Sequence, residues 1–94
     1  MSDLEVPGGG LPTLGGDMAN QLTVGREFDA TLNGARMRLR VRRILRGSVG
    51  DVDAMVIPQW RDKGYGTYHL GLYRDPEVDP QGSLIVAFEL QRVG

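Results

Sequence analysis

Residues 22–42 decide the fold, and they read LTVGREFDATLNGARMRLRVR. Apolar and polar side chains alternate on both sides of Asn33-Gly34, as expected for two half-buried β-strands. A type I′ hairpin turn needs positive φ at both central residues, and Asn-Gly is a dipeptide that meets this need readily. Residues 22–32 and the alternating run that follows Gly34 are therefore predicted to form an antiparallel hairpin.

The two-residue turn also fixes which residues face each other. Asp29 then lies opposite Arg38, and Glu27 lies opposite Arg40, on the face of the hairpin that points to solvent. Both pairs are opposite in charge. Each pair contributes only about 0.2–1 kcal/mol, so the pairs select the register more than they stabilise the hairpin.

The alternation slips by one residue at Arg42-Arg43 and then resumes. This slip predicts a β-bulge, which would return Ile44 to the inner face of the sheet. A third strand is expected over residues 52–57. Pro58 is expected to end it, because proline cannot donate to a strand ladder. Residues 59–66 are then predicted to form a loop.

Two further strands are predicted, over residues 67–73 and 83–92. The second has the apolar core LIVAF at residues 84–88, and a strand that is apolar on both faces should lie in the middle of its sheet. No stretch has a helical period. The chain is thus predicted to be all-β: a small five-stranded antiparallel barrel or sandwich over residues 21–94.

Residues 1–20 differ in composition from the rest of the chain. They contain five glycines and two prolines and show neither helical nor strand periodicity, so we expect an extended N-terminal arm. Apolar side chains recur along it, which suits a segment that contacts neighbouring subunits; a frayed tail is the alternative. The candidate contact residues are Leu4, Val6, Leu11 and Leu14.

The charge is unevenly distributed. The chain has 11 basic and 12 acidic residues and a net charge of -1, but residues 36–46 contain six arginines and no acid. Such a ribbon suits either a protein-docking face or the phosphates of a nucleic acid. The acids opposite it, and the lack of aromatic residues on its exposed face, favour a solvated or protein-docking face. The candidate residues are Arg36, Arg38, Arg40 and Arg42.

The predicted loop at residues 59–66 contains residue types that dominate protein interfaces, namely Trp60, Arg61 and Tyr65. The alternative for Trp60 is that its ring packs on the small core. Tyr65 lies between two glycines, which favours an exposed position at the tip of the loop.

Catalytic and metal-binding motifs are missing from the sequence. There is no cysteine, and His69 is the sole histidine, so no thiol nucleophile, zinc cluster or triad is predicted. Asp75, Glu77 and Asp79 have the spacing of calcium ligands, but Pro80 stands where a calcium loop needs glycine, which favours an acidic turn. We therefore expect no enzyme activity, no cofactor and no metal.

The expected function is that of a structural or assembly protein. The N-terminus resembles no signal peptide and no apolar run is long enough to cross a membrane, so a cytoplasmic or virion-associated protein without a membrane partner is predicted. We expect a small β domain that docks on a large homomeric assembly, such as a viral particle, with its arm on neighbouring subunits. A nucleic-acid-binding domain and a small inhibitor or adaptor are the alternatives.

Overall fold

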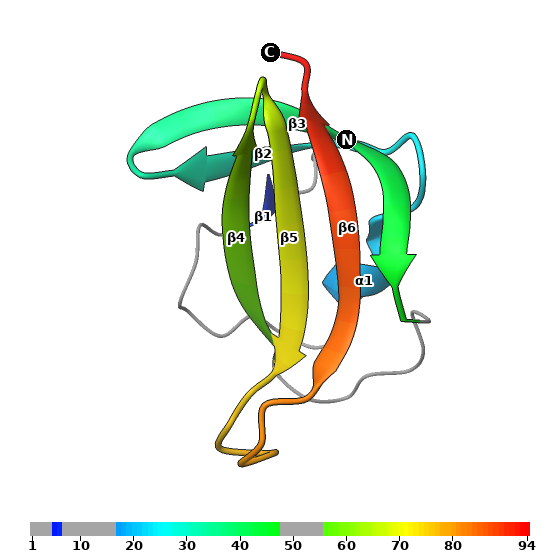
Figure 1. Cartoon of the computed structure of the whole chain (residues 1–94), viewed down its shortest axis with the longest axis vertical. Helices are drawn as coiled ribbons and strands as arrows, with labels where there is room; N and C mark the ends of the chain where they lie inside the picture. Colours follow the sequence, from blue (N-terminus) through cyan, green and yellow to red (C-terminus); the bar gives the residue numbers. More distant parts are fainter. Residues whose placement is uncertain (1–4, 7–16, 48–55) are drawn as a thin grey trace.

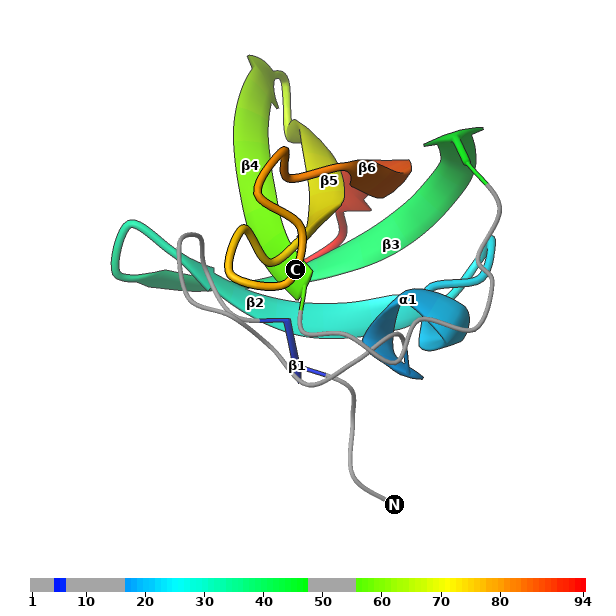
Figure 2. The same cartoon turned by 90° about the horizontal axis from the view of Figure 1, so that it is seen from below.

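The computed structural model describes residues 5–6, 17–47 and 56–94. Within these residues the elements are β1 (Glu5–Val6), α1 (Asp17–Gln21), β2 (Glu27–Leu32), β3 (Ala35–Arg46), β4 (Val56–Gly64), β5 (Thr67–Arg74) and β6 (Leu84–Arg92). The strands form one six-stranded sheet in the order β1-β2-β3-β6-β5-β4, which curls into a half-barrel (Figures 1 and 2). The predicted all-β class is confirmed. The sheet is mixed rather than purely antiparallel, because β1 pairs with β2 in parallel.

The hairpin predicted from Asn33-Gly34 is confirmed. Both turn residues have positive φ, 51° and 82°, as a type I′ turn requires. The pairing follows the predicted register along the whole of β2: Glu27 faces Arg40 and Asp29 faces Arg38. The turn chemistry and the alternation of side chains therefore specify this part of the sheet together.

The predicted bulge in β3 is also present. The register between β3 and β6 shifts between Val41 and Arg43, and after this shift Ile44 pairs with Phe88. Ile44 thus returns to the phase of the inner face, as predicted. Its side chain is nevertheless 39% exposed, so it does not join the core.

The strand predicted to begin at residue 22 starts later, at Glu27. The chain turns at Gly25, which has a φ of 90° and donates its N–H to the carbonyl of Val41 at 2.8 Å. Leu22 is fully buried ahead of this turn, whereas Val24 is 63% exposed. A left-handed glycine interrupts the strand that the alternation predicted.

The expectation of an arm without helix or strand is wrong in two places. Residues Glu5–Val6 form β1 on the edge of the sheet, and Asp17–Gln21 form α1. The side chain of Val6 is fully buried in the core of this same chain, together with Met18 and Ala19 of α1. Leu4, Leu11 and Leu14 lie outside the described residues, so their predicted contacts stay predictions.

The predicted end of the third strand at Pro58 is wrong. Residues 48–55 lie outside the described part of the chain, and β4 continues through Pro58 to Gly64. Pro58 is tolerated because β4 is the last strand of the sheet. The backbone N–H groups on the outer side of an edge strand bond to no neighbouring strand, so proline can stand there. The predicted loop at 59–66 is therefore mostly strand, and it ends in a tight turn at Tyr65-Gly66.

The core fills the inside of the half-barrel. β6 lies between β3 and β5, as its apolar sequence predicted. Its inward side chains, Val86, Phe88 and Leu90, are fully buried against Phe28, Leu39, Val41, Val56, Leu70 and Leu72. Trp60, Tyr68 and Ile85 pack against this core from its margin.

Candidate functional site

A groove of about 610 Å³ opens at the mouth of the half-barrel, between the β2–β3 hairpin and the β4–β5 hairpin. Its walls come from strands that are far apart in the sequence and are brought together by the curl of the sheet (Figure 2). The described residues that line it are Leu32, Asn33, Ala35, Met37, Trp60, Asp62, Tyr68 and Arg92.

The groove combines an apolar interior with a charged rim. Met37 is only 5% exposed, and the partly buried rings of Trp60 and Tyr68 pack against the core beside it. Asp62 and Arg92 are exposed and line the same groove, so it offers one carboxylate and one guanidinium around an apolar interior. Sites that bind ligands or partners have this combination of aromatic area and a few charged groups.

The three interface residues predicted for the loop at 59–66 do not form one surface. They are Trp60, Arg61 and Tyr65. Successive residues of a strand point to opposite faces, so Trp60 faces the core and Arg61 faces the outside of the sheet. Tyr65 is fully exposed at the tip of the β4–β5 hairpin. It has positive φ, and Asp62 accepts the backbone N–H of Gly64 at 2.8 Å beside it.

The groove residues Met37, Tyr68, Asp62 and Arg92 were not singled out from the sequence. Alternation places Met37 and Tyr68 on an inner face, and this was the only available signal. Their position at an open mouth, rather than in a closed core, depends on how far the sheet curls. Local sequence does not specify that curl.

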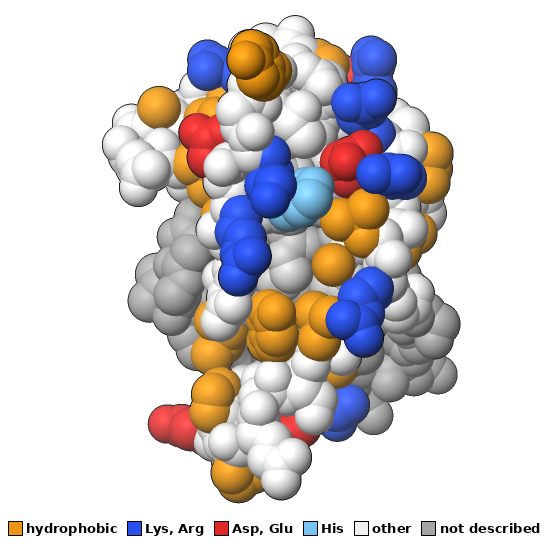
Figure 3. All heavy atoms as spheres, viewed as in Figure 1, with side chains coloured by type: hydrophobic (Ala, Val, Ile, Leu, Met, Phe, Trp, Pro, Cys, Tyr) orange, Lys and Arg blue, Asp and Glu red, His pale blue; other side chains and the backbone are white. Residues whose placement is uncertain are grey.

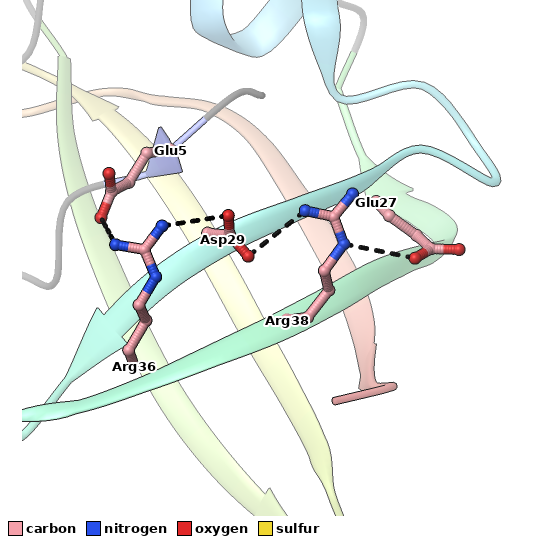
Figure 4. Close-up of polar contacts among 5 residues, drawn as sticks. All are labelled: Glu5, Glu27, Asp29, Arg36 and Arg38. Atoms are coloured by element: carbon pink, nitrogen blue, oxygen red, sulfur yellow. Dashed lines mark hydrogen bonds and ion pairs between the residues drawn. The ribbon is translucent and has the colours of Figure 1, made fainter. Parts of the chain in front are cut away.

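The first three arginines of β3 lie in a network of carboxylates. Arg36 contacts Glu5 at 3.5 Å and Asp29 at 3.2 Å, and Arg38 contacts Asp29 at 3.3 Å and Glu27 at 3.4 Å (Figure 4). Arg40 contacts the other carboxylate oxygen of Glu27 at 2.8 Å. The network ties β1, β2 and β3 together. Carboxylates of the same chain therefore balance the positive charge of these three arginines. This does not favour phosphate binding there.

The next arginines of β3 contact Glu89 on β6. Arg43 binds its carboxylate twice, at 3.1 Å each, and Arg42 approaches it at 4.0 Å. His69 on β5 places its Nε2 3.6 Å from the same carboxylate. Arg46 and Arg61 differ from these arginines: across 5–6, 17–47 and 56–94, no carboxylate lies within ion-pair distance of either.

These contacts lower the pKa of two glutamates. Hydrogen bonds from Arg40 and Arg38 hold the pKa of Glu27 below its ordinary value, and a hydrogen bond from Arg43 does the same for Glu89. A carboxyl group whose pKa is lower in the folded state binds protons more weakly there than in the unfolded chain. It therefore stabilises the fold above its unfolded pKa, and this contribution is lost as the pH falls through the folded pKa.

We therefore expect the free energy of unfolding to fall as the pH is lowered below about 4.5, the ordinary value for glutamate. Urea unfolding at pH 7, 5, 4 and 3 measures the loss. The double variant Glu27→Gln, Glu89→Gln should be less stable at pH 7 but lose less on acidification. Parallel pH profiles for the two proteins would contradict this assignment.

The acidic turn after β5 is held by hydrogen bonds within the turn itself. Asp75 is buried and accepts the N–H of Glu77 at 2.9 Å, and Asp79 accepts the hydroxyl of Ser83 at 2.6 Å. The Ser83 hydroxyl holds the pKa of Asp79 below its ordinary value. These bonds give the acids a structural role, as predicted for a turn.

No family model, curated protein or solved structure matches the chain. The described part of the chain has no helix that combines the length and apolar character needed to cross a membrane. In the same part, no three histidine or acidic side chains are grouped so that they could hold a metal ion.

Proposed function

We propose that this chain is a non-catalytic binding domain that docks on a protein partner through the groove at the mouth of the half-barrel. The observation that carries the proposal is the cluster of Met37, Trp60 and Tyr68, which lines an open groove of about 610 Å³ rather than a closed core. Tryptophan, tyrosine and methionine are enriched at protein interfaces, where they fill pockets on the partner or form them.

The groove favours a partner segment of particular chemistry. A large apolar side chain would fill the space beside Met37 and Trp60 and bury apolar surface. A basic residue on one side of it would meet Asp62, and an acidic residue on the other side would meet Arg92. We therefore propose that the partner presents an exposed loop or chain end with an apolar residue between opposite charges.

The proposed setting is a larger assembly built from repeated copies of the partner, a viral particle being one such assembly. Chains below about 100 residues bury a modest core, and docking adds to their stability. Self-association of this chain through the same groove is the other form that the proposal allows. Sedimentation of the purified chain over a range of concentrations distinguishes the two forms.

Selection from a random peptide library on the immobilised chain tests the proposal. We expect the selected peptides to share a large apolar residue with a basic neighbour. Binding of such a peptide should weaken at least tenfold in Asp62→Arg, because a like charge then faces its basic residue. Fluorescence anisotropy of the labelled peptide measures the affinity.

Glu77→Arg is the matched control, since it makes the same charge change at an exposed position in the turn before β6. Its affinity should stay within about twofold of the original chain. Equal losses in both variants would mean that net charge, and not the groove, determines binding. A library that yields no shared motif would also contradict the proposal.

A further inference from the structure

The outer face of the sheet carries a row of polar side chains that crosses four strands. Arg43 on β3 pairs with Glu89 on β6, Glu89 pairs with His69 on β5, and His69 pairs with Arg61 on β4. Residues that pair across strands stand on the same face, so these four side chains form one line on the side of the sheet opposite the groove. In Figure 3 the histidine lies in the middle of this face with basic side chains on both sides.

A hollow of about 280 Å³ lies beside this row. The hollow exists because Gly71 of β5 pairs with Ala87 of β6. This pair lies on the same face as the polar row, two residues away along each strand, and it has almost no side chain. Arg46, which pairs with Ala87, stands at one end. The ring of Tyr73 reaches over Gly71, where an added Cβ would come within 2.9 Å of the tyrosine Cε2.

The hollow has an excess of positive charge. Among its described lining residues, Arg46, Arg61 and His69 are the basic groups, and no acid lines it. Glu89 stands next to His69, but Arg43 already occupies its carboxylate. The neighbouring wall is apolar and aromatic: it is formed by Tyr73, Leu84 and Leu45.

We propose that this hollow binds single-stranded nucleic acid, with phosphates on Arg46 and Arg61 and a base on the ring of Tyr73. This goes beyond the proposed protein-docking function and uses a different face. The sequence offered no aromatic residue among the arginines of the hairpin, but the sheet brings Tyr73 from β5 beside them. Arginine and aromatic side chains on one sheet face are the combination that single-strand binders use.

Strand spacing supports more than one phosphate contact. Arg46 and Arg61 stand on β3 and β4, three strand intervals apart, which corresponds to about 14 Å across the sheet. In the proposed binding mode the two arginines contact different nucleotides of one strand. The apolar wall between them would cover an unstacked base, which a duplex does not expose.

Fluorescence anisotropy with labelled 12-nucleotide dT and U strands, at 50 mM and 200 mM salt, tests this proposal. We expect binding that weakens with salt. Arg46→Glu and Arg61→Glu should each weaken it at least fivefold and make the salt dependence less steep by about one phosphate contact. Tyr73→Ala should weaken binding about tenfold, whereas Tyr73→Phe, which keeps the ring, should stay within about threefold.

Arg92→Glu is the matched control, because it makes the same charge change in the groove on the other side of the sheet. It should leave strand binding within about twofold, and urea unfolding should show that each variant is folded. Binding that is absent at 50 mM salt, equally tight to a 12-base-pair duplex, or equally reduced in Arg92→Glu would overturn the proposal. None of these results bears on the groove, whose peptide binding is measured separately.

Discussion

Phe88→Ala is expected to lower the free energy of unfolding by about 3–5 kcal/mol. Phe88 is fully buried in β6, between Ile44 of β3 and Leu70 of β5, so truncation leaves a cavity at the centre of the sheet. A domain of this size has only about 5–15 kcal/mol in total. Urea denaturation followed by circular dichroism measures the change.

Two control variants separate the cavity from a general effect of substitution. Phe88→Leu keeps most of the apolar volume and should cost less than about 1.5 kcal/mol. Val78→Ala, at a position that is 58% exposed, should change the stability by no more than about 0.5 kcal/mol. A loss below about 1 kcal/mol for Phe88→Ala would mean that this side chain is not at the centre of the core.

Gly47→Ala is expected to have the second large effect, a loss of about 2–5 kcal/mol. Gly47 follows β3 with a φ of 81°, and a Cβ there would overlap the backbone carbonyl of Ile85 in β6. The substitution therefore adds a left-handed alanine and a clash with backbone that cannot move without breaking the sheet. The same denaturation experiment measures it.

Gly25→Ala is the control, because Gly25 has nearly the same φ, 90°, but open space around its Cα. This variant carries the left-handed penalty alone, about 1–2 kcal/mol. If Gly47→Ala lowers the free energy of unfolding no more than Gly25→Ala does, then Gly47 does not lie as close to the backbone of β6 as described.

Much of the sheet was predictable from local chemistry. Asn33-Gly34 specified a turn whose twist suits two strands, and the register followed from it. The slip at Arg42-Arg43 located the bulge, and the apolar core of β6 placed that strand between two neighbours. Each of these features depends on residues close together in the sequence.

The features that the sequence did not predict depend on tertiary position. Pro58 was expected to end a strand, but its place on the sheet edge leaves its missing N–H without cost. Glu5–Val6 have no strand pattern of their own and pair with β2 because its edge is open. Short segments like these acquire structure from their neighbours and not from their own sequence.

The candidate sites were predictable only in part. Trp60 was recognised as an interface residue or a core residue, and it lies at the margin of the core while lining the groove. The sequence pattern predicts one arginine surface over residues 36–46, whereas acids on β1 and β2 neutralise one half of it. Only the pairing of β3 with β6 and of β5 with β4 places Arg46 and Arg61 on the face that carries Tyr73.

The proposed function requires a protein partner to occupy the groove at the mouth of the half-barrel. Titration of the isotopically labelled chain with a selected peptide, followed by NMR, tests this claim directly. We predict that the methyl signals of Met37 and Leu32 shift, while the amide of Gly71 and the methyl of Ala87, on the opposite face, stay in place. Shifts confined to Gly71 and Ala87, or spread evenly over both faces, would contradict the claim.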